Sequence, residues 1–222
     1  MTNSRREFFR VLFGFFITKH FLLAPFSSMV RLAYGKAAKV ILPKGTKTES
    51  LISRNPSNLD TRNLEITPLK DFGTMGLTDY KADTDLWRLK MDGHVRRSLM
   101  LKYEDILALP SIEKDVLMIC PGVFVNHGRW KGLSMDALLN RAEAETGSTH
   151  MTFRGPEGDY EKTQQFPLED VLSNKVFLAY QVNGKMLPNK HGFPLRIVAE
   201  GYYGHDWVKF VCRVTVDKIK EK

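Results

Sequence analysis

The chain has 222 residues, of which 43% are hydrophobic and 26% are charged, and its formal net charge is +8. This length suits one sizeable globular domain, or one domain with a tail. Most of the positive charge lies near the N-terminus, because residues 1–36 hold six Lys or Arg and one acidic residue. The other residues hold 27 basic and 24 acidic side chains. A body so nearly balanced in charge argues against a nucleic-acid-binding protein.

The first 37 residues have the features of an export signal. The stretch SRREF at residues 4–8 matches the S-R-R-x-F form of twin-arginine signals, and an apolar stretch at residues 11–26 follows it. That stretch is short for a membrane span, and Lys19-His20 interrupts it. Small residues at 33–37 offer a cleavage point. We therefore expect residues 1–37 to be a twin-arginine signal peptide for the periplasm. The alternatives are an ordinary amphipathic helix and an uncleaved membrane anchor.

In the rest of the chain the sequence pattern changes near residue 86. Residues 38–85 are rich in turn formers and have no long apolar period, which predicts a loop-rich segment. Beyond it, short strand patterns mix with short helical patterns, without βαβ regularity. Strands are expected at 86–93, 98–102, 114–120, 150–155, 176–182, 194–200 and 207–216, and helices at 103–109, 134–145 and 166–174. The mixture predicts an α+β fold with a mixed sheet, whose main body spans residues 86–222.

The most reactive side chain belongs to Cys120, which ends the apolar run KDVLMIC and precedes Pro121-Gly122. The residues alone leave three interpretations open. Cys120 could be a buried structural thiol, could form a disulfide with Cys212 in an oxidising compartment, or could act as a metal ligand or nucleophile. Cys212 lies in the alternating run WVKFVCRVTV and is expected to fill a core position.

A second group of polar residues lies within residues 187–211, where His, Arg and Lys stand among Gly and Pro. Arg196 can grip a phosphate with its forked guanidinium, Lys209 adds a point charge, and exposed backbone N–H groups add donors. The pattern favours a polyanion site over a solvated loop with a few charges. His191 and His205 could also suggest zinc, but no third ligand stands at a recognisable spacing.

Several separated stretches resemble motifs of one family. LPNKHGFPLRIV and GYYGHDWVKFV are similar to a closing signature, and they are preceded in order by WRLKMDG, GRWKGLSMDALL and AYQVNGKMLP. These stretches resemble the sulfite oxidase family of molybdopterin-dependent oxidoreductases, over about residues 66–217. The resemblance implies the sulfite-oxidase-type molybdopterin-binding fold, with mixed β-sheets and short helices. It also implies a relation to the catalytic subunit of periplasmic methionine sulfoxide reductase.

The resemblance implies a catalytic centre at Cys120, which falls where the family places the thiolate ligand of molybdenum. The implied cofactor is molybdenum–molybdopterin, with the metal bound through Cys120 and no haem in this chain. Tyr203 and His127 are candidates for catalytic roles on the substrate side, where Tyr202 is a further candidate. The residues implied to hold the cofactor are Thr67, Lys70, Asp71, Phe72, Gly155, His191, Arg196, Trp207, Val208 and Lys209.

The substrate pocket departs from the family pattern. Residues 121–127 lack the A-G-N and the arginines that many sulfite oxidases carry, and also the V-E-A-W of the sulfoxide reductase branch. Either His127 or Arg129 would have to substitute. The resemblance still implies an exported oxidoreductase that moves an oxygen atom and two electrons, with sulfite or a sulfoxide as substrate.

The resemblance also bears on partners. We expect a monomer that exchanges electrons with a separate cytochrome or with a membrane protein linked to haem or quinone. No nucleic-acid partner is expected. The alternative function is a non-catalytic exported binding module that has kept the fold and lost the cofactor.

Overall fold

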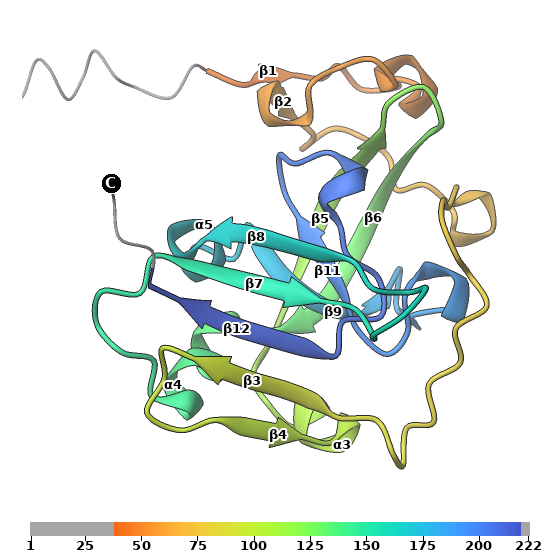
Figure 1. Cartoon of the computed structure of the whole chain (residues 1–222). Coiled ribbons are helices and arrows are strands. Elements are labelled where there is room, and N and C mark those ends of the chain that lie inside the picture. The colour runs from red at the N-terminus through yellow and green to blue at the C-terminus, as the bar shows by residue number, and fades with distance from the viewer. Residues whose placement is uncertain (1–37, 219–222) are drawn as a thin grey trace, which may run out of the picture. The chain divides into compact units, whose positions relative to one another are not determined.

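The computed structural model describes residues 38–218, and the predicted signal peptide lies outside this range (Figure 1). The described residues form two five-stranded sheets and a small two-stranded one. Helices in this range are short, and none is long and apolar enough to cross a membrane. The predicted α+β class with mixed sheets is confirmed.

The first sheet is antiparallel and is built on one long hairpin. Its strands are β5 (Ser111–Cys120), β6 (Phe124–Leu133), β9 (Val176–Val182), β10 (Lys185–Met186) and β11 (Arg196–Ala199). Each strand of the β5–β6 hairpin has ten residues, and Cys120 pairs with Phe124 at its tip. The sequence patterns did not predict β6, because its polar residues and glycines interrupt the alternation of apolar side chains.

The two faces of this hairpin are both covered by apolar side chains. Val116 and Met118 lie in the main core cluster, whereas Leu117 and Ile119 lie in a second cluster. Alternate residues of a strand point to opposite faces, so a strand buried on both sides reads as a continuous apolar run. The run KDVLMIC is therefore explained by burial on two sides.

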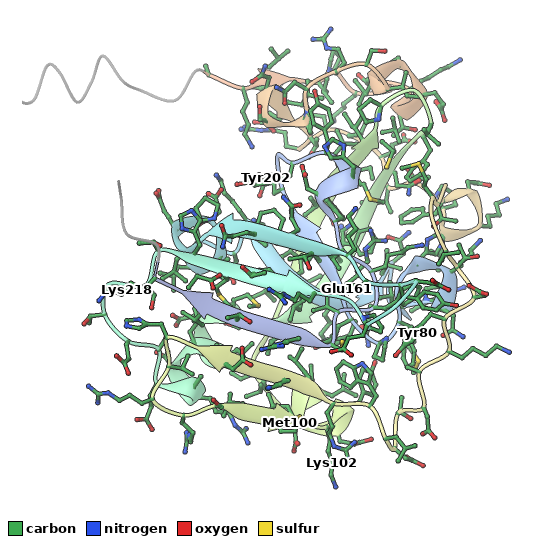
Figure 2. All side chains as sticks on the ribbon, viewed as in Figure 1. Tyr80, Met100, Lys102, Glu161, Tyr202 and Lys218 are labelled. Carbon is green, nitrogen blue, oxygen red and sulfur yellow. The ribbon has the colours of Figure 1, made fainter. Side chains whose placement is uncertain are left out.

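The second sheet is mixed and has the strand order β4-β3-β12-β7-β8. Its strands are β3 (Leu89–Gly93), β4 (Leu99–Leu101), β7 (His150–Arg154), β8 (Thr163–Pro167) and β12 (Arg213–Asp217). β12 runs parallel to β3 and antiparallel to β7. On the outer strand β4, Met100 points outward and is 60% exposed, while both of its neighbours are buried (Figure 2).

The strand predicted at 207–216 is shorter in the structure and begins only at Arg213. Phe210 has a positive φ of 59°, which an extended strand does not allow. Residues 207–211 therefore form a bent segment in which Trp207 and Val208 remain buried. Cys212 is half-buried and packs at the edge of the core, so the expectation of a core position holds only in part.

The helices agree with their predicted places. They are α3 (Tyr103–Leu107), α4 (Met135–Ala142) and α5 (Leu168–Leu172). In α4 the buried residues recur at helical spacing: Met135, Leu138, Leu139 and Ala142. The helix ends at Glu143, whose left-handed backbone conformation closes the last turn.

Residues 38–85 contain little regular structure. They include β1 (Val40–Ile41), β2 (Leu59–Asp60) and three 3-10 helices, η1 (Thr48–Leu51), η2 (Pro56–Asn58) and η3 (Leu69–Asp71). Two further 3-10 helices lie later in the chain, η4 (Asn189–His191) and η5 (Gly204–Asp206). Four leucines of the early segment pack on Leu117 and Ile119, so this segment covers the outer face of the β5–β6 hairpin.

Candidate active site

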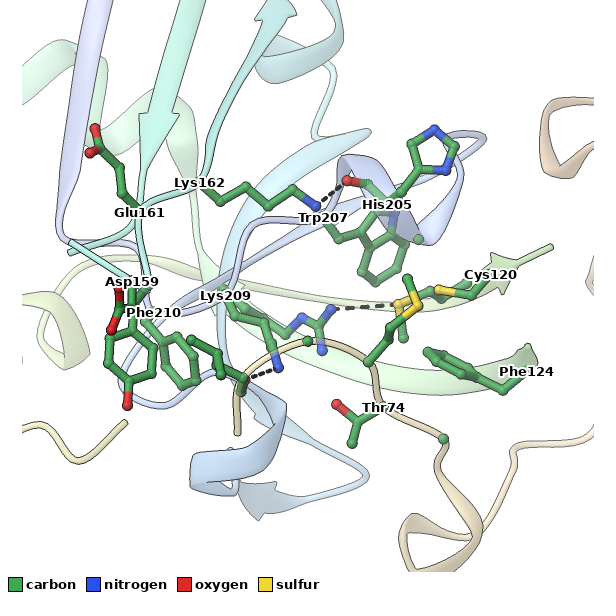
Figure 3. A pocket seen from close by; sticks show the side chains of 18 residues that line it. Thr74, Cys120, Phe124, Asp159, Glu161, Lys162, His205, Trp207, Lys209 and Phe210 are labelled. Atoms are coloured by element: carbon green, nitrogen blue, oxygen red, sulfur yellow. Dashed lines mark hydrogen bonds between the residues drawn. The ribbon is translucent and has the colours of Figure 1, made fainter. Parts of the chain in front are cut away.

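A cavity of about 380 Å³ lies at the tip of the β5–β6 hairpin (Figure 3). Segments 73–77, 159–162 and 204–210 form its other walls. Four of the predicted site residues line it: Cys120, Arg196, Trp207 and Lys209. The structure therefore brings together a thiol and two cations that lie far apart in the sequence.

Cys120 reaches the cavity because it is the last residue of β5. Its side chain is 4% exposed, and the backbone at Gly204 presses against it, since a Cβ at Gly204 would lie 2.3 Å from Sγ. Burial raises the pKa of the Cys120 thiol, while the positive charges of Arg196 and Lys162 act to lower it. Cys120 and Cys212 are both free, so no disulfide joins them in this structure.

Arg196 begins β11 and lies buried beside the cavity. Its guanidinium donates to the carbonyl oxygen of His191 at 3.0 Å and lies over the rings of Trp130 and Trp207, at 5.1 and 5.4 Å. Burial lowers the pKa of Arg196 to about 10. Among residues 38–218 no carboxylate forms an ion pair with it. A buried guanidinium without a counter-charge fits a bound anion.

Two lysines add to this positive charge. Lys209 Nζ donates to the carbonyl oxygen of Leu77 at 2.5 Å, and burial together with Arg196 lowers the pKa of Lys209 to about 8. Lys162 Nζ donates to the carbonyl oxygen of His205, and partial desolvation lowers the pKa of Lys162 as well, although its side chain is still accessible from solvent. A low pKa means that the charged form lacks solvation, and an anion in the cavity would supply the missing stabilisation.

Two buried polar groups near Arg196 have no hydrogen-bond partner among the described residues. They are the imidazole of His191, at both ring nitrogens, and Nε1 of Trp207. Burial and the nearby cations lower the pKa of His191 to about 4. Buried donors and acceptors are almost always satisfied in folded proteins. These unpaired atoms therefore indicate that a polar ligand belongs beside them.

Other predicted cofactor residues support the walls instead of lining the cavity. Phe72 packs against Trp130 and His191, with ring centroids 5.9 and 5.8 Å apart. Val208 is buried in the core, and Gly155 donates its N–H to the carbonyl oxygen of Lys162 at 3.0 Å.

Three further predicted residues lie in the segment that precedes the cavity wall. Thr67 is bonded to the backbone of His127 in both directions, at 2.8 and 3.0 Å. Asp71 and Lys70 are both exposed and lie in η3. Neither Thr67 nor the two η3 residues line the cavity.

The structure does not bring the predicted substrate-side residues to the cavity. His127 pairs with Leu117, so it lies on the opposite face of the hairpin from Cys120, and its Nδ1 donates to the carbonyl oxygen of Glu65 at 3.1 Å. Arg129 is exposed and paired with Asp115 at 2.8 Å.

The two tyrosines are also turned away. Tyr203 stacks on His205, with ring centroids 5.6 Å apart, and packs against the second cluster. Tyr202 donates its hydroxyl proton to Asp170 at 2.5 Å. Catalytic contact with substrate is not supported by these positions.

Two residues that shape the cavity had no clear signal in the sequence. The buried side chain of Asn126 accepts from the N–H of Gly73 and donates to its carbonyl oxygen, both at 2.9 Å. This clamp fixes the segment 73–77 over the cavity. Lys162 lies in the polar stretch EKTQQ, where a cation reads as surface.

Comparison with known proteins gives the family. The profile of the family described as "Oxidoreductase molybdopterin binding domain" matches residues 76–222. This chain belongs to that family. The resemblance to sulfite oxidases inferred from the motifs is thereby confirmed.

Two curated relatives illustrate the range of the family. The chain is 31% identical to human mitochondrial sulfite oxidase over 72% of this chain and 34% of that protein. It is 29% identical to the protein-methionine-sulfoxide reductase catalytic subunit MsrP of Gluconobacter oxydans, over 58% of this chain and 46% of that protein. The chain thus spans less than half the length of these relatives.

A solved structure shows the shared fold. The sulfane dehydrogenase SoxCD of Paracoccus pantotrophus superposes with a TM-score of 0.59 at 24% identity, covering 64% of this chain and 40% of that chain. The sulfite-oxidase-type molybdopterin-binding fold is confirmed.

The cavity residues fit the family's cofactor. Cys120 offers a soft sulfur ligand, Arg196 and Lys209 offer charge for a phosphate, and the unpaired Nε1 of Trp207 offers a hydrogen bond. The imidazole of His191 also lacks a partner among the described residues, but it does not line this cavity. A zinc site is not supported, because residues 38–218 contain no cluster of three or more His, Cys, Asp or Glu side chains that could hold a metal ion.

Proposed function

We propose that the chain is the catalytic unit of an exported molybdenum oxidoreductase that transfers an oxygen atom and two electrons. The observation that carries this proposal is the thiol of Cys120 at a strand end, facing a cavity that Arg196, Lys162 and Lys209 make positive. Family membership supports it. The substrate would be sulfite or a sulfoxide, the classes that appear in the names of the two relatives described above.

The residues would divide the work as follows. Cys120, as a thiolate, would ligate molybdenum, and Gly204 would hold the sulfur in place from the other side. Arg196 and Lys209 would bind the phosphate of the cofactor. The bound molybdopterin supplies the oxygen-atom and two-electron chemistry.

His191 and Trp207 would orient the cofactor through hydrogen bonds. His191 stays neutral at neutral pH because burial and the nearby cations lower its pKa to about 4. A neutral imidazole has one donor and one acceptor nitrogen, so it can bind a group that offers both. Phe72 and Trp130 pack around these side chains and exclude water from them.

Export and the redox partner are parts of the same proposal. The twin-arginine pattern at residues 4–8 supports periplasmic export of the folded, loaded protein. A separate cytochrome, or a membrane protein linked to haem or quinone, would exchange the electrons. Replacing Arg5 and Arg6 by Lys should retain the protein in the cytoplasm, as cell fractionation would show. Normal export of that variant would refute this route.

Elemental mass spectrometry on protein produced in a molybdopterin-competent host tests the central claim. We expect one molybdenum per chain in the wild type and in Cys212→Ser, the matched control. Cys120→Ser should fold normally but lose turnover of sulfite and of methionine sulfoxide. Well-folded wild-type protein without molybdenum would favour the non-catalytic binding module. Full activity of Cys120→Ser would refute the role of Cys120.

A further inference from the structure

The cavity has two electropositive ends, and the proposed function gives a specific role to the lysine of only one of them. Lys209 Nζ bonds to the carbonyl oxygens of Leu77 and Lys190, on the side of segment 73–77. Lys162 Nζ bonds to the carbonyl oxygen of His205, on the side of η5 (Figure 3). The two ammonium groups thus reach the cavity from different walls.

The Lys162 end is the end at which the thiol lies. Lys162 bonds to His205, and the adjacent Gly204 has its backbone against Sγ of Cys120. Lys162 is therefore a cation at the end of the cavity where the Cys120 thiol lies.

The surroundings leave the Lys162 ammonium able to bind a further group. Among residues 38–218 its only hydrogen bond is to His205, which leaves two of its three N–H donors. The carboxylate that interacts electrostatically with the Lys162 ammonium is that of Asp206, yet the two form no ion pair within the described residues. The side chain is accessible from solvent, as a substrate-binding group must be.

The local backbone holds Lys162 in this place. The N–H of Gly155 donates to the carbonyl oxygen of Lys162 at 3.0 Å, and a Cβ at Gly155 would meet the carbonyl oxygen of Tyr160 at 2.7 Å. Gly155 thus lets the segment 160–162 pack closely on the end of β7. A loop lysine that merely faced solvent would not need this support.

We propose that Lys162 is the substrate-positioning cation of this enzyme and selects a small oxyanion such as sulfite over a neutral sulfoxide. The inference rests on the proposed function and assigns a substrate class to it. Lys162 would take the place of the arginines that residues 121–127 lack. A strongly hydrated point charge with two free donors suits a small tetrahedral or pyramidal oxyanion.

The test uses the molybdopterin-loaded protein and inorganic sulfate as the probe, measured by titration calorimetry at low salt. Lys162→Met should weaken sulfate binding about 10- to 100-fold, because it removes a charge-assisted hydrogen bond. The KM for sulfite should rise by a similar factor, whereas kinetics with dimethyl sulfoxide and the molybdenum content stay unchanged. Lys162→Arg should restore most of the affinity. Lys185→Met, on exposed β10, controls for net charge.

Each other outcome decides against the inference. Sulfate affinity of Lys162→Met within twofold of wild type, or no saturable sulfate binding by the wild type, would overturn it. Loss of molybdenum from Lys162→Met alone would assign Lys162 to the cofactor and overturn it too. Wild-type protein without molybdenum would overturn the proposed function itself. The molybdenum content therefore distinguishes failure of the proposed function from failure of the role of Lys162.

Discussion

Replacing His191 by Asn should make the cofactor-free protein less sensitive to acid. The imidazole of His191 is 1% exposed, has no hydrogen-bond partner at either nitrogen and lies near three cations. Its pKa is lowered from 6.5 to about 4. In the unfolded chain the same imidazole takes up a proton near pH 6.5. Between pH 6.5 and pH 4 the unfolded state therefore binds more protons, so stability falls as the pH falls through this window.

The magnitude follows from the size of the pKa change. A pKa lowered from 6.5 to about 4 corresponds to a decrease of about 3 kcal/mol in the free energy of unfolding at low pH, since each pKa unit is worth ~1.4 kcal/mol. That amount is lost in full only below pH 4 and not at all above pH 6.5. It is a large share of the ~5–15 kcal/mol that stabilises a typical domain.

Urea unfolding of the cofactor-free protein at several pH values from 7 to 4 measures the effect. The wild type should lose about 3 kcal/mol more than His191→Asn across this range. His150→Asn, at a half-buried imidazole that is hydrogen-bonded to Thr149 Oγ1 at 3.0 Å, controls for the replacement of a histidine by asparagine. Equal slopes for the wild type and His191→Asn would refute the reasoning.

Three further substitutions follow from the geometry of the site. Asn126→Ala removes both hydrogen bonds to Gly73 and should cost about 2–4 kcal/mol in urea unfolding, as two polar groups lose partners; a loss below ~1 kcal/mol would mean that water replaces the clamp. Gly204→Ala places a Cβ 2.3 Å from Cys120 Sγ and should lower molybdenum content, with a cost of about 1–3 kcal/mol from overpacking; normal loading would contradict the close approach. Arg129→Ala should leave turnover and the urea midpoint unchanged, because its ion pair is exposed; a changed KM for sulfite would return Arg129 to the substrate pocket.

Local patterns were sufficient for most helices and for the strand that carries Cys120. Apolar spacing placed α4 and its buried face, and an apolar run that stops at Pro121-Gly122 placed the thiol at a strand end. These features depend on a few neighbouring residues, so composition and period reveal them. The motifs then placed Cys120, Arg196, Trp207 and Lys209 in one site, and the structure brings those four to one cavity.

The residues whose positions or roles the sequence did not predict share one cause. His127 follows Cys120 by seven positions and looks close in sequence, but the hairpin register turns it to the other face. The role of Asn126 depends on its partner Gly73, which lies 53 positions earlier in the chain. Lys162 looks like surface charge because its partner, His205, lies on a distant segment. Such roles depend on contacts across the sheet, which local sequence does not encode.

The ten-residue ladder between β5 and β6 also limits how this protein can change over time. Side chains on a strand alternate between faces, so losing one residue within β5 would turn the thiol of Cys120 away from the cavity and toward the outer leucine cluster. Substitutions that keep an apolar side chain would leave the thiol where it is. Related proteins should therefore differ in the residue types of β5 but not in its number of residues. Insertions and deletions should be confined to segments away from this hairpin.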